Sequence, residues 1–112
     1  MIFKILRANE AAALAQSSVL KGSSVDLADG FIHFSTAAQV EETAARHFSA
    51  ESGLWLVAVR TAEVTEALRW EPSRGGDLFP HLFAPLTTEA VVWLKPLPLG
   101  PDGHHRFPDL GA

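Results

Sequence analysis

The chain of 112 residues contains no cysteine and no long hydrophobic run. Without cysteine, disulfides, thiol chemistry and thiolate metal sites are excluded, and a reducing cytoplasm is the simplest compartment. The longest apolar stretches, such as AVVWL, are far shorter than the roughly 20 residues of a membrane-spanning helix. Basic residues are also few, because 9 of them against 13 acidic residues give a net charge of −4. This balance argues against non-specific nucleic-acid binding, although one or two arginines suffice for a small phosphorylated ligand.

The length and composition indicate one folded domain. A chain this short cannot form two self-sufficient cores, and 47% hydrophobic with 20% charged residues is typical of a globular protein. The C-terminal segment PLGPDGHHRFPDLGA is rich in proline and glycine, which favour turns and irregular backbone. We therefore predict a single domain over residues 1–112 with an irregular tail from about residue 98.

Hydrophobic periodicity predicts an α+β fold of two layers, in the order β-α-β-α-β followed by further strands. Helices are predicted after Asn9, which can act as an N-cap, and after Thr36, which forms a capping-box pattern with Gln39. The glycine-, serine- and proline-rich segments 21–30 and 72–89 are expected to be loops. The predicted helices cover residues 10–18 and 36–48, and the predicted strands cover residues 2–6, 31–35, 52–60 (as a central strand), 67–71 and 90–97.

The segment FIHFS places a histidine between large aromatic side chains. Because side chains alternate along a strand, Ile32 and Phe34 are expected to face the core, while Phe31, His33 and Ser35 share the other face. That face lies where the strand runs into a helix N-terminus, whose free backbone N–H groups favour anions and polar ligands. Two interpretations remain open: a ligand-facing histidine, or a structural one that bonds a backbone carbonyl while Ser35 caps the helix.

The segment RWEPSRGGDLFPH is the second candidate site. Arg69 and Arg74 carry fork-shaped donors that can hold a phosphate or a carboxylate at two points. Gly75 allows the backbone to approach a ligand closely, and His81 is a second histidine beside aromatic residues. The alternative is a scaffold, in which Glu71 and Arg74 form a weak surface salt bridge across a turn.

Other kinds of site are not favoured by the motifs. The five histidines show neither H-x-x-x-H nor H-E-x-x-H spacing, so no metal site is predicted. RGG lacks the spacing of a phosphate-binding P-loop, and no G-x-S-x-G elbow supports a serine nucleophile. Among the three tryptophans, Trp70 is the one that stands beside the polar cluster, next to Glu71.

Three blocks of the sequence carry a family likeness. IFKIL, DLADGFIHFSTAAQVEETAARHF and LRWEPSRGGDLFPHLF resemble the bacterial domain-of-unknown-function family 952 over about residues 2–100. That family is usually placed, on fold, near the ADP-ribosyltransferase superfamily, which includes the tRNA 2′-phosphotransferases. The resemblance implies a small split-sheet α+β domain whose cleft, in relatives, accepts NAD or a related ADP-ribosyl group.

Few superfamily residues carry over to this chain. The early His-Gly-Ser/Thr pattern, which holds ribose and nicotinamide, would correspond to His33, Phe34 and Ser35, with phenylalanine in place of glycine. The chain has no tyrosine, so the His-Tyr-Glu triad of the toxin-like transferases is absent. The phosphotransferase-like branch relies on histidine and arginine, which His81 with Arg69 or Arg74 could supply. The letters HLFA also stand where the family pattern has tyrosine and glycine after the second histidine.

Three hypotheses about function follow. The first is a cytoplasmic ADP-ribosyltransferase-like or phosphotransferase-like enzyme that handles NAD or an ADP-ribose-like ligand. The second is a non-catalytic module that binds a nucleotide-like metabolite, and the third is a structural or partner-binding domain. Substrate, acceptor and oligomeric state are left open. The candidate catalytic residues are His33, Glu71 and His81, and the candidate ligand-binding residues are Ser35, Thr36, Arg69, Trp70, Ser73, Arg74 and Gly75.

Overall fold

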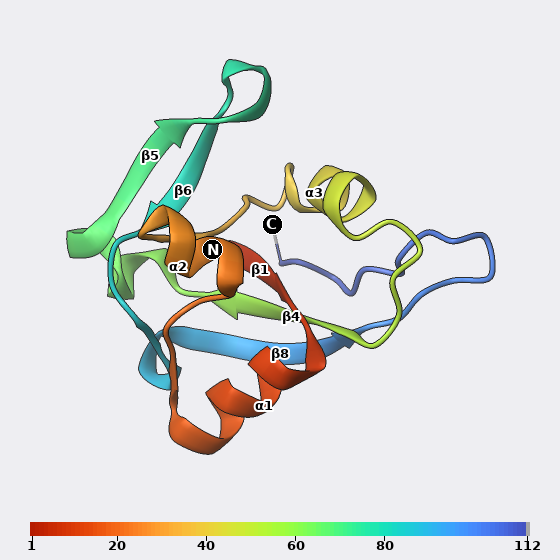
Figure 1. The fold of residues 1–112 in the computed structure, drawn as a ribbon, viewed down its shortest axis with the longest axis horizontal. Coiled ribbons are helices and arrows are strands. Elements are labelled where there is room, and N and C mark those ends of the chain that lie inside the picture. Colours follow the sequence, from red (N-terminus) through yellow and green to blue (C-terminus); the bar gives the residue numbers. More distant parts are fainter. Residues whose placement is uncertain (112) are drawn as a thin grey trace.

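The computed structural model describes residues 1–111, apart from the side chain of Arg74, and has an α+β architecture (Figure 1). Three small sheets are present in this part of the chain, with strand orders β1-β4-β8, β3-β6-β5 and β2-β7. The helices are α1 (Ala8–Ser17), α2 (Ser24–Asp29) and α3 (Val40–His47). The strands are β1 (Ile2–Leu6), β2 (Val19–Leu20), β3 (Ile32–His33), β4 (Leu54–Val59), β5 (Leu68–Pro72), β6 (Leu78–Leu82), β7 (Leu86–Thr87) and β8 (Val91–Leu97).

Strand β4 occupies the centre of the first sheet, antiparallel to both β1 and β8. Its two faces contribute to two separate apolar clusters, one containing Val57 and Val59 and the other containing Leu54, Leu56 and Ala58. A strand covered on both faces reads as a nearly continuous apolar run. The prediction of a central strand here is confirmed.

The second sheet lies against the first through one bridge. Phe3 of β1 exchanges two backbone hydrogen bonds of 2.8 Å with Ser35, just after β3. Within the second sheet β3 pairs with β6, and β5 and β6 form a hairpin that extends away from the body of the molecule (Figure 1). This arrangement brings residues 33 and 81 together although they lie far apart in the sequence.

Two segments predicted to be loops contain regular structure, and both predictions were wrong. Residues 24–29 form α2, because Ser23 and Asp26 make a reciprocal capping box. Residues 78–82 form β6 although they include Pro80, and this strand lies between β3 and β5. Pro80 faces Phe34, just past the end of β3, which is only two residues long. The amide of Phe34 still donates to the carbonyl of Pro80 at 3.0 Å, and the N–H that proline lacks would have pointed beyond the end of that strand.

The predicted helix starts also differ from the structure. Helix α1 begins after Arg7 rather than Asn9, because the amide of Arg7 bonds the carboxylate of Glu10 at 2.8 Å. Helix α3 begins at Val40, because the turn that Thr36 makes with Gln39 precedes it. Since capping residues can stand at neighbouring positions, helix ends are the least certain part of such predictions.

The alternation predicted for residues 32 and 34 is confirmed, because Ile32 and Phe34 are both buried in the core. The C-terminal tail is irregular, as predicted, and its residues Phe107 and Leu110 pack on the cluster beneath α3. Over the described residues no helix is long and apolar enough to cross a membrane.

Candidate functional site

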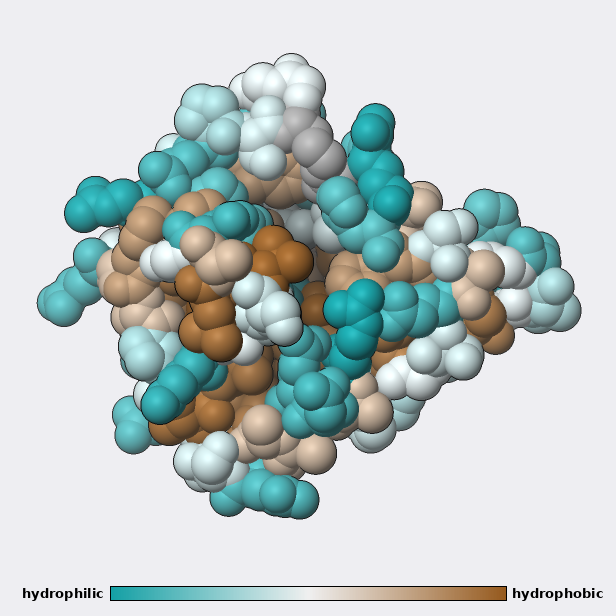
Figure 2. All heavy atoms as spheres, in the orientation of Figure 1, coloured by the Kyte–Doolittle hydropathy of each residue, from teal (hydrophilic) through white to brown (hydrophobic). Residues whose placement is uncertain are grey.

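A cavity of about 450 Å³ lies between α2, β1 and α3 and reaches the β5–β6 hairpin. Figure 2 shows this face of the molecule hollowed, with hydrophobic and hydrophilic residues side by side around the hollow. We call this cavity the cleft. Its walls include Lys4, His33, Ser35 and His81, four polar residues from three different elements or their ends, and apolar side chains such as Phe34. A volume of about 300–1,000 Å³ is typical of small-molecule sites.

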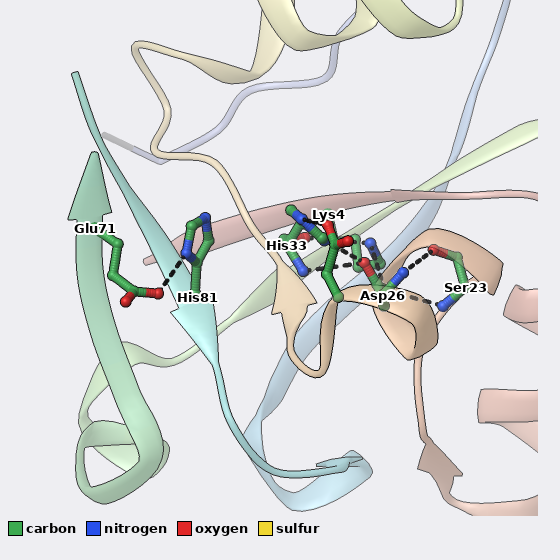
Figure 3. A network of polar contacts seen from close by, with 7 residues as sticks. Lys4, Ser23, Asp26, His33, Glu71 and His81 are labelled. Atoms are coloured by element: carbon green, nitrogen blue, oxygen red, sulfur yellow. Dashed lines mark hydrogen bonds and ion pairs between the residues drawn. The ribbon is translucent and has the colours of Figure 1, made fainter. Parts of the chain in front are cut away.

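Asp26 lies at the centre of the polar network beside the cleft (Figure 3). Its carboxylate accepts hydrogen bonds from the amide of Ser23 at 2.9 Å, the amine of Lys4 at 3.0 Å and Nδ1 of His33 at 2.6 Å. The amide of His33 adds a longer bond of 3.2 Å to the same carboxylate. The side chain of Asp26 is only 2% exposed, so these donors replace water around its charge.

The electrostatics of Asp26 follow from this geometry. Burial by itself would raise the pKa of the Asp26 carboxyl, because it disfavours the charged form. The hydrogen bond from His33 and the charge of Lys4 outweigh burial and hold the pKa of Asp26 far below its ordinary value. Asp26 is therefore a buried carboxylate that stays ionised.

His33 is held by carboxylates at both ring nitrogens. Nδ1 faces Asp26 at 2.6 Å, and Nε2 lies 3.0 Å from a carboxylate oxygen of Asp29. Of these two contacts, the one between Nδ1 and Asp26 has the geometry of a hydrogen bond, and the one between Nε2 and Asp29 is a close approach of the two groups. His33 therefore stands at the cleft wall with a carboxylate beside each of its ring nitrogens.

His81 is oriented differently. Its Nδ1 lies 2.8 Å from a carboxylate oxygen of Glu71 on the neighbouring strand (Figure 3). No other described residue bonds its Nε2, and the ring lines the cleft. In the neutral tautomer in which Nδ1 donates to Glu71, Nε2 carries the lone pair and can accept a proton.

The two histidines are direct neighbours, because His33 and His81 are register partners across β3 and β6. Their ring centroids are 5.4 Å apart, and Phe31 contacts both rings, at 4.6 Å from His33 and 4.2 Å from His81. Phe83 continues this aromatic group at 5.0 Å from Phe31. The rings restrict each other's rotation and fix the directions in which the imidazole nitrogens point.

The structure brings some of the remaining candidate residues to the cleft. Ser35 and Ser73 both line it. The hydroxyl of Ser35 bonds that of Thr43 at 2.9 Å, and the hydroxyl of Thr43 in turn donates to the carbonyl of Gln39. Either hydroxyl of the Ser35–Thr43 pair can be the donor, and the oxygen of Ser35 keeps a lone pair that can accept a hydrogen bond.

Other candidates lie away from the cleft wall. Thr36 bonds the side chain of Gln39 through its amide and, like Gly75 in the hairpin turn, is not among the lining residues. Arg69 is exposed on the same side of β5 as Glu71, and Trp70 is on the opposite side and 45% exposed. The side chain of Arg74 lies outside the described part of the structure.

Lys4, Asp26 and Asp29 were not predicted as site residues from the sequence. Lys4 donates to the backbone carbonyl of His33 at 3.2 Å, and Asp26 and Asp29 lie beside its ring nitrogens. All three come from positions that had been assigned to a strand face or to a loop. A usable signal was present, because SSVD is a capping-box pattern that predicts a helix starting near residue 24. Such a short helix would have placed Asp26 and Asp29 on one side, three residues apart.

The fold and the cleft define a small α+β domain with a pair of carboxylate-anchored histidines. The chain belongs to the family described as "Protein of unknown function (DUF952)", whose model matches residues 5–94. The resemblance to family 952 is thereby confirmed.

Solved structures of one relative share this fold. The crystal structure of protein CC0527 from Caulobacter crescentus is 45% identical, with a TM-score of 0.88, and the match covers 94% of this chain and 92% of that one. The solution NMR structure of CC0527 is also 45% identical, with a TM-score of 0.82 and coverage of 98% and 92%. Among curated proteins no sequence matches this chain.

The chemistry available in the cleft is proton transfer and hydrogen bonding. Within residues 1–111 no group of three histidine, cysteine, aspartate or glutamate side chains is arranged to hold a metal ion. Nε2 of His81 is available for a proton or a hydrogen bond, while Lys4 and Asp26 form a buried ion pair beside His33. These groups suit a ligand with several polar oxygens.

Proposed function

We propose that the cleft binds an ADP-ribosyl compound, NAD or ADP-ribose, and that the protein is an ADP-ribosyltransferase-like enzyme in which His81 is the general base. The observation that carries the proposal is the Glu71–His81 pair, whose Nε2 is left without a partner among the described residues and faces the cleft. A histidine oriented by a carboxylate at one nitrogen is the usual arrangement of a catalytic acid–base group.

The fold supports the same assignment. The early histidine strand β3 is displaced from the sheet β1-β4-β8 and belongs to a second sheet with the hairpin. The resemblance to that superfamily implies a split sheet with a histidine at the end of an early strand, and this arrangement supports the proposal. Because one fold can carry many activities, the cleft residues carry the functional argument rather than the topology.

The proposed reaction assigns one role to each group. His81 takes the proton of an acceptor hydroxyl or of water at Nε2, as the oxygen forms a bond to the ribosyl carbon. The bond from that carbon to nicotinamide breaks, and nicotinamide leaves with the electron pair. Glu71 keeps the ring of His81 in the required tautomer, and the ring of His33 forms part of the wall against which the sugar side of the ligand lies. Ser35 and Ser73 offer further polar contacts to the ligand.

A second candidate function is supported by the state of His33. Both of its ring nitrogens already face carboxylates of the same chain, which leaves no free atom on this ring for chemistry. A module that binds a nucleotide-like metabolite without turning it over needs only such a fixed, polar wall. Binding without turnover would favour this second function.

The first experiment tests binding. Ligand-observed NMR with millimolar NAD or ADP-ribose is expected to detect binding to the wild type that His33→Ala abolishes. His104→Ala, which removes an exposed histidine of the C-terminal tail, is the matched control and is expected to bind as the wild type does. Absence of binding to the wild type would contradict both nucleotide-based functions.

The second experiment separates catalysis from binding. Incubation of the wild type with NAD is expected to release nicotinamide. His81→Asn keeps a donor near the position of Nδ1 for Glu71 but lacks Nε2, so release should fall by about 100-fold or more while affinity changes little. Equal release by both proteins would overturn the role of His81, and binding without any release would leave the second candidate function.

A further inference from the structure

The cleft has a second polar wall away from the histidines. Its residues are Arg7 and Glu10, at the junction of β1 and α1, and His47 and Phe48, at the end of α3. In Figure 1 the junction of β1 and α1 and the tip of the β5–β6 hairpin lie on opposite sides of the molecule. We call this second wall the arginine end of the cleft.

Helix α3 runs between the hairpin and the arginine end. Its start approaches the hairpin, because the side chain of Gln39, just before the helix, donates to the carbonyl of Leu78 at 2.8 Å. Phe48 follows its last residue, and the guanidinium of Arg7 lies over the Phe48 ring. The 8 residues of the helix rise by about 12 Å, so one ligand in contact with both regions must be elongated.

Arg7 is held in one orientation at this end. Its Nε and Nη2 donate to the carboxylate of Glu51 at 2.8 and 3.1 Å, and its guanidinium carbon lies 4.9 Å from the centre of the Phe48 ring. A guanidinium has five N–H donors, and no other described residue bonds those that remain on Nη1 and Nη2. The carboxylate of Glu10 accepts from the backbone amide of Arg7 at 2.8 Å. Arg7 therefore brings a permanent positive charge with unused donors to the wall of the cleft.

We propose that Arg7 binds a phosphate group of the ligand at the arginine end, while the reacting end of the ligand lies at the histidines. This inference rests on the proposed function and adds the direction in which the ligand lies; in an ADP-ribosyl compound the group is the pyrophosphate. The planar donors of arginine match phosphate oxygens better than a point charge does. Because Glu51 and Phe48 already fix the guanidinium, little side-chain freedom is lost on binding.

The first test compares affinities for ADP-ribose by isothermal titration calorimetry. Arg7→Ala removes the guanidinium, so ADP-ribose is expected to bind about tenfold more weakly than to the wild type, as for the loss of one hydrogen bond to a charged group. Arg7→Lys keeps the charge without the planar donors and should lose less. Arg46→Ala is the matched control, because Arg46 pairs with Glu42 on the exposed side of α3 and does not line the cleft. Its affinity is expected to equal that of the wild type.

Glu51→Gln separates ligand binding from a structural role of the ion pair. It removes the negative charge and leaves the guanidinium, so the affinity for ADP-ribose should be unchanged or higher. A loss as large as that of Arg7→Ala would show that the pair acts by holding the loop, and would overturn the inference. Equal affinity of Arg7→Ala and the wild type would overturn it as well, and the proposed function would stand.

Inorganic pyrophosphate gives a second readout that does not depend on the ADP-ribosyl assignment. Titration to millimolar pyrophosphate, followed through the arginine Nε–H signals by NMR, is expected to shift the signal of Arg7 and to leave that of Arg46 unchanged. A shift at Arg7 in a protein that does not bind ADP-ribose would support the phosphate site and contradict the proposed function. No shift at Arg7, or equal shifts at both arginines, would overturn the inference.

Discussion

Asp26 is the residue on which the geometry of the cleft depends. It joins β1 through Lys4, the start of α2 through Ser23 and β3 through His33, all within 3.2 Å. A buried charge of this kind is favourable only while its partners remain in place. The contribution of Asp26 to the free energy of unfolding can be measured directly.

Replacement of Asp26 by asparagine should destabilise the fold. The introduced amide group would turn a donor toward Lys4 or His33, which are themselves donors, and would leave buried charge uncompensated. The expected loss in the free energy of unfolding is about 3 kcal/mol, measured by urea denaturation. Asp29→Asn, at an exposed pair, is the control and should cost less than about 1 kcal/mol; equal costs would contradict the central role of Asp26.

The lowered pKa of Asp26 predicts a particular dependence of stability on pH. Because its pKa is lower in the folded protein than the ordinary value of 3.8, the unfolded chain binds the proton more readily. The stabilisation by Asp26 is therefore complete above pH 3.8 and is lost as the pH falls through the lowered folded pKa. Urea denaturation at several pH values should show that the difference in the free energy of unfolding between the wild type and Asp26→Asn shrinks below pH 3.8. A difference that grew on acidification would contradict the assignment.

At the residue scale, alternation along the strand was enough to predict that Ile32 and Phe34 are buried, but not that Ser35 on the other face is buried too. It placed Ile32 and Phe34 in the core and left His33 on the face that lines the cleft. It could not identify Asp26 or Asp29, because their partner His33 comes from the next element of the chain and the contact depends on tertiary structure. Alternation thus identifies the histidine, whereas the carboxylates beside it depend on the short capped helix α2 and on its packing against β3.

At the scale of elements, α2 has only six residues and is held mainly by its first turn. The capping box closes that turn and sets the direction of the Asp26 side chain. Short helices have little intrinsic stability, since nucleation is costly and few hydrogen bonds repay it. The capping serine is therefore expected to matter for both stability and site geometry.

Replacement of Ser23 by alanine tests this expectation. The loss of the side-chain bond to the amide of Asp26 should lower the free energy of unfolding by about 1 kcal/mol, measured by urea denaturation. The imidazole NMR signals of His33 should shift as well, because Asp26 loses part of its support. Ser52→Ala, in an exposed turn, is the matched control; the same cost at both positions would show that the capping box contributes nothing particular.

The hairpin of β5 and β6 illustrates why some elements were predicted incompletely. Strand β5 was predicted from its own residues, whereas β6 was assigned to a loop because it contains proline. Strand β6 forms because β5 on one side and β3 on the other supply backbone hydrogen-bond partners. Local propensity does not take such partners into account. The result matters for function, since β6 carries His81 and β5 carries Glu71.

At the scale of the whole molecule, the α+β class and the central strand β4 were predictable, and the division into three small sheets was not. The division decides the site, because the bridge between Phe3 and Ser35 joins the sheet that carries Lys4 to the sheet that carries the histidines. Contacts of this range are set by packing across the whole chain. The cleft is a product of that packing and not of any single motif.

The most direct test of the central claim is an NMR titration of the imidazole signals of all five histidines with ADP-ribose. The signals of His33 and His81 are expected to shift together with one affinity, while those of His104 in the exposed tail stay unchanged. Shifts at His104 alone, or no shift at any histidine up to millimolar ligand, would contradict the claim that the paired histidines form an ADP-ribosyl-binding cleft.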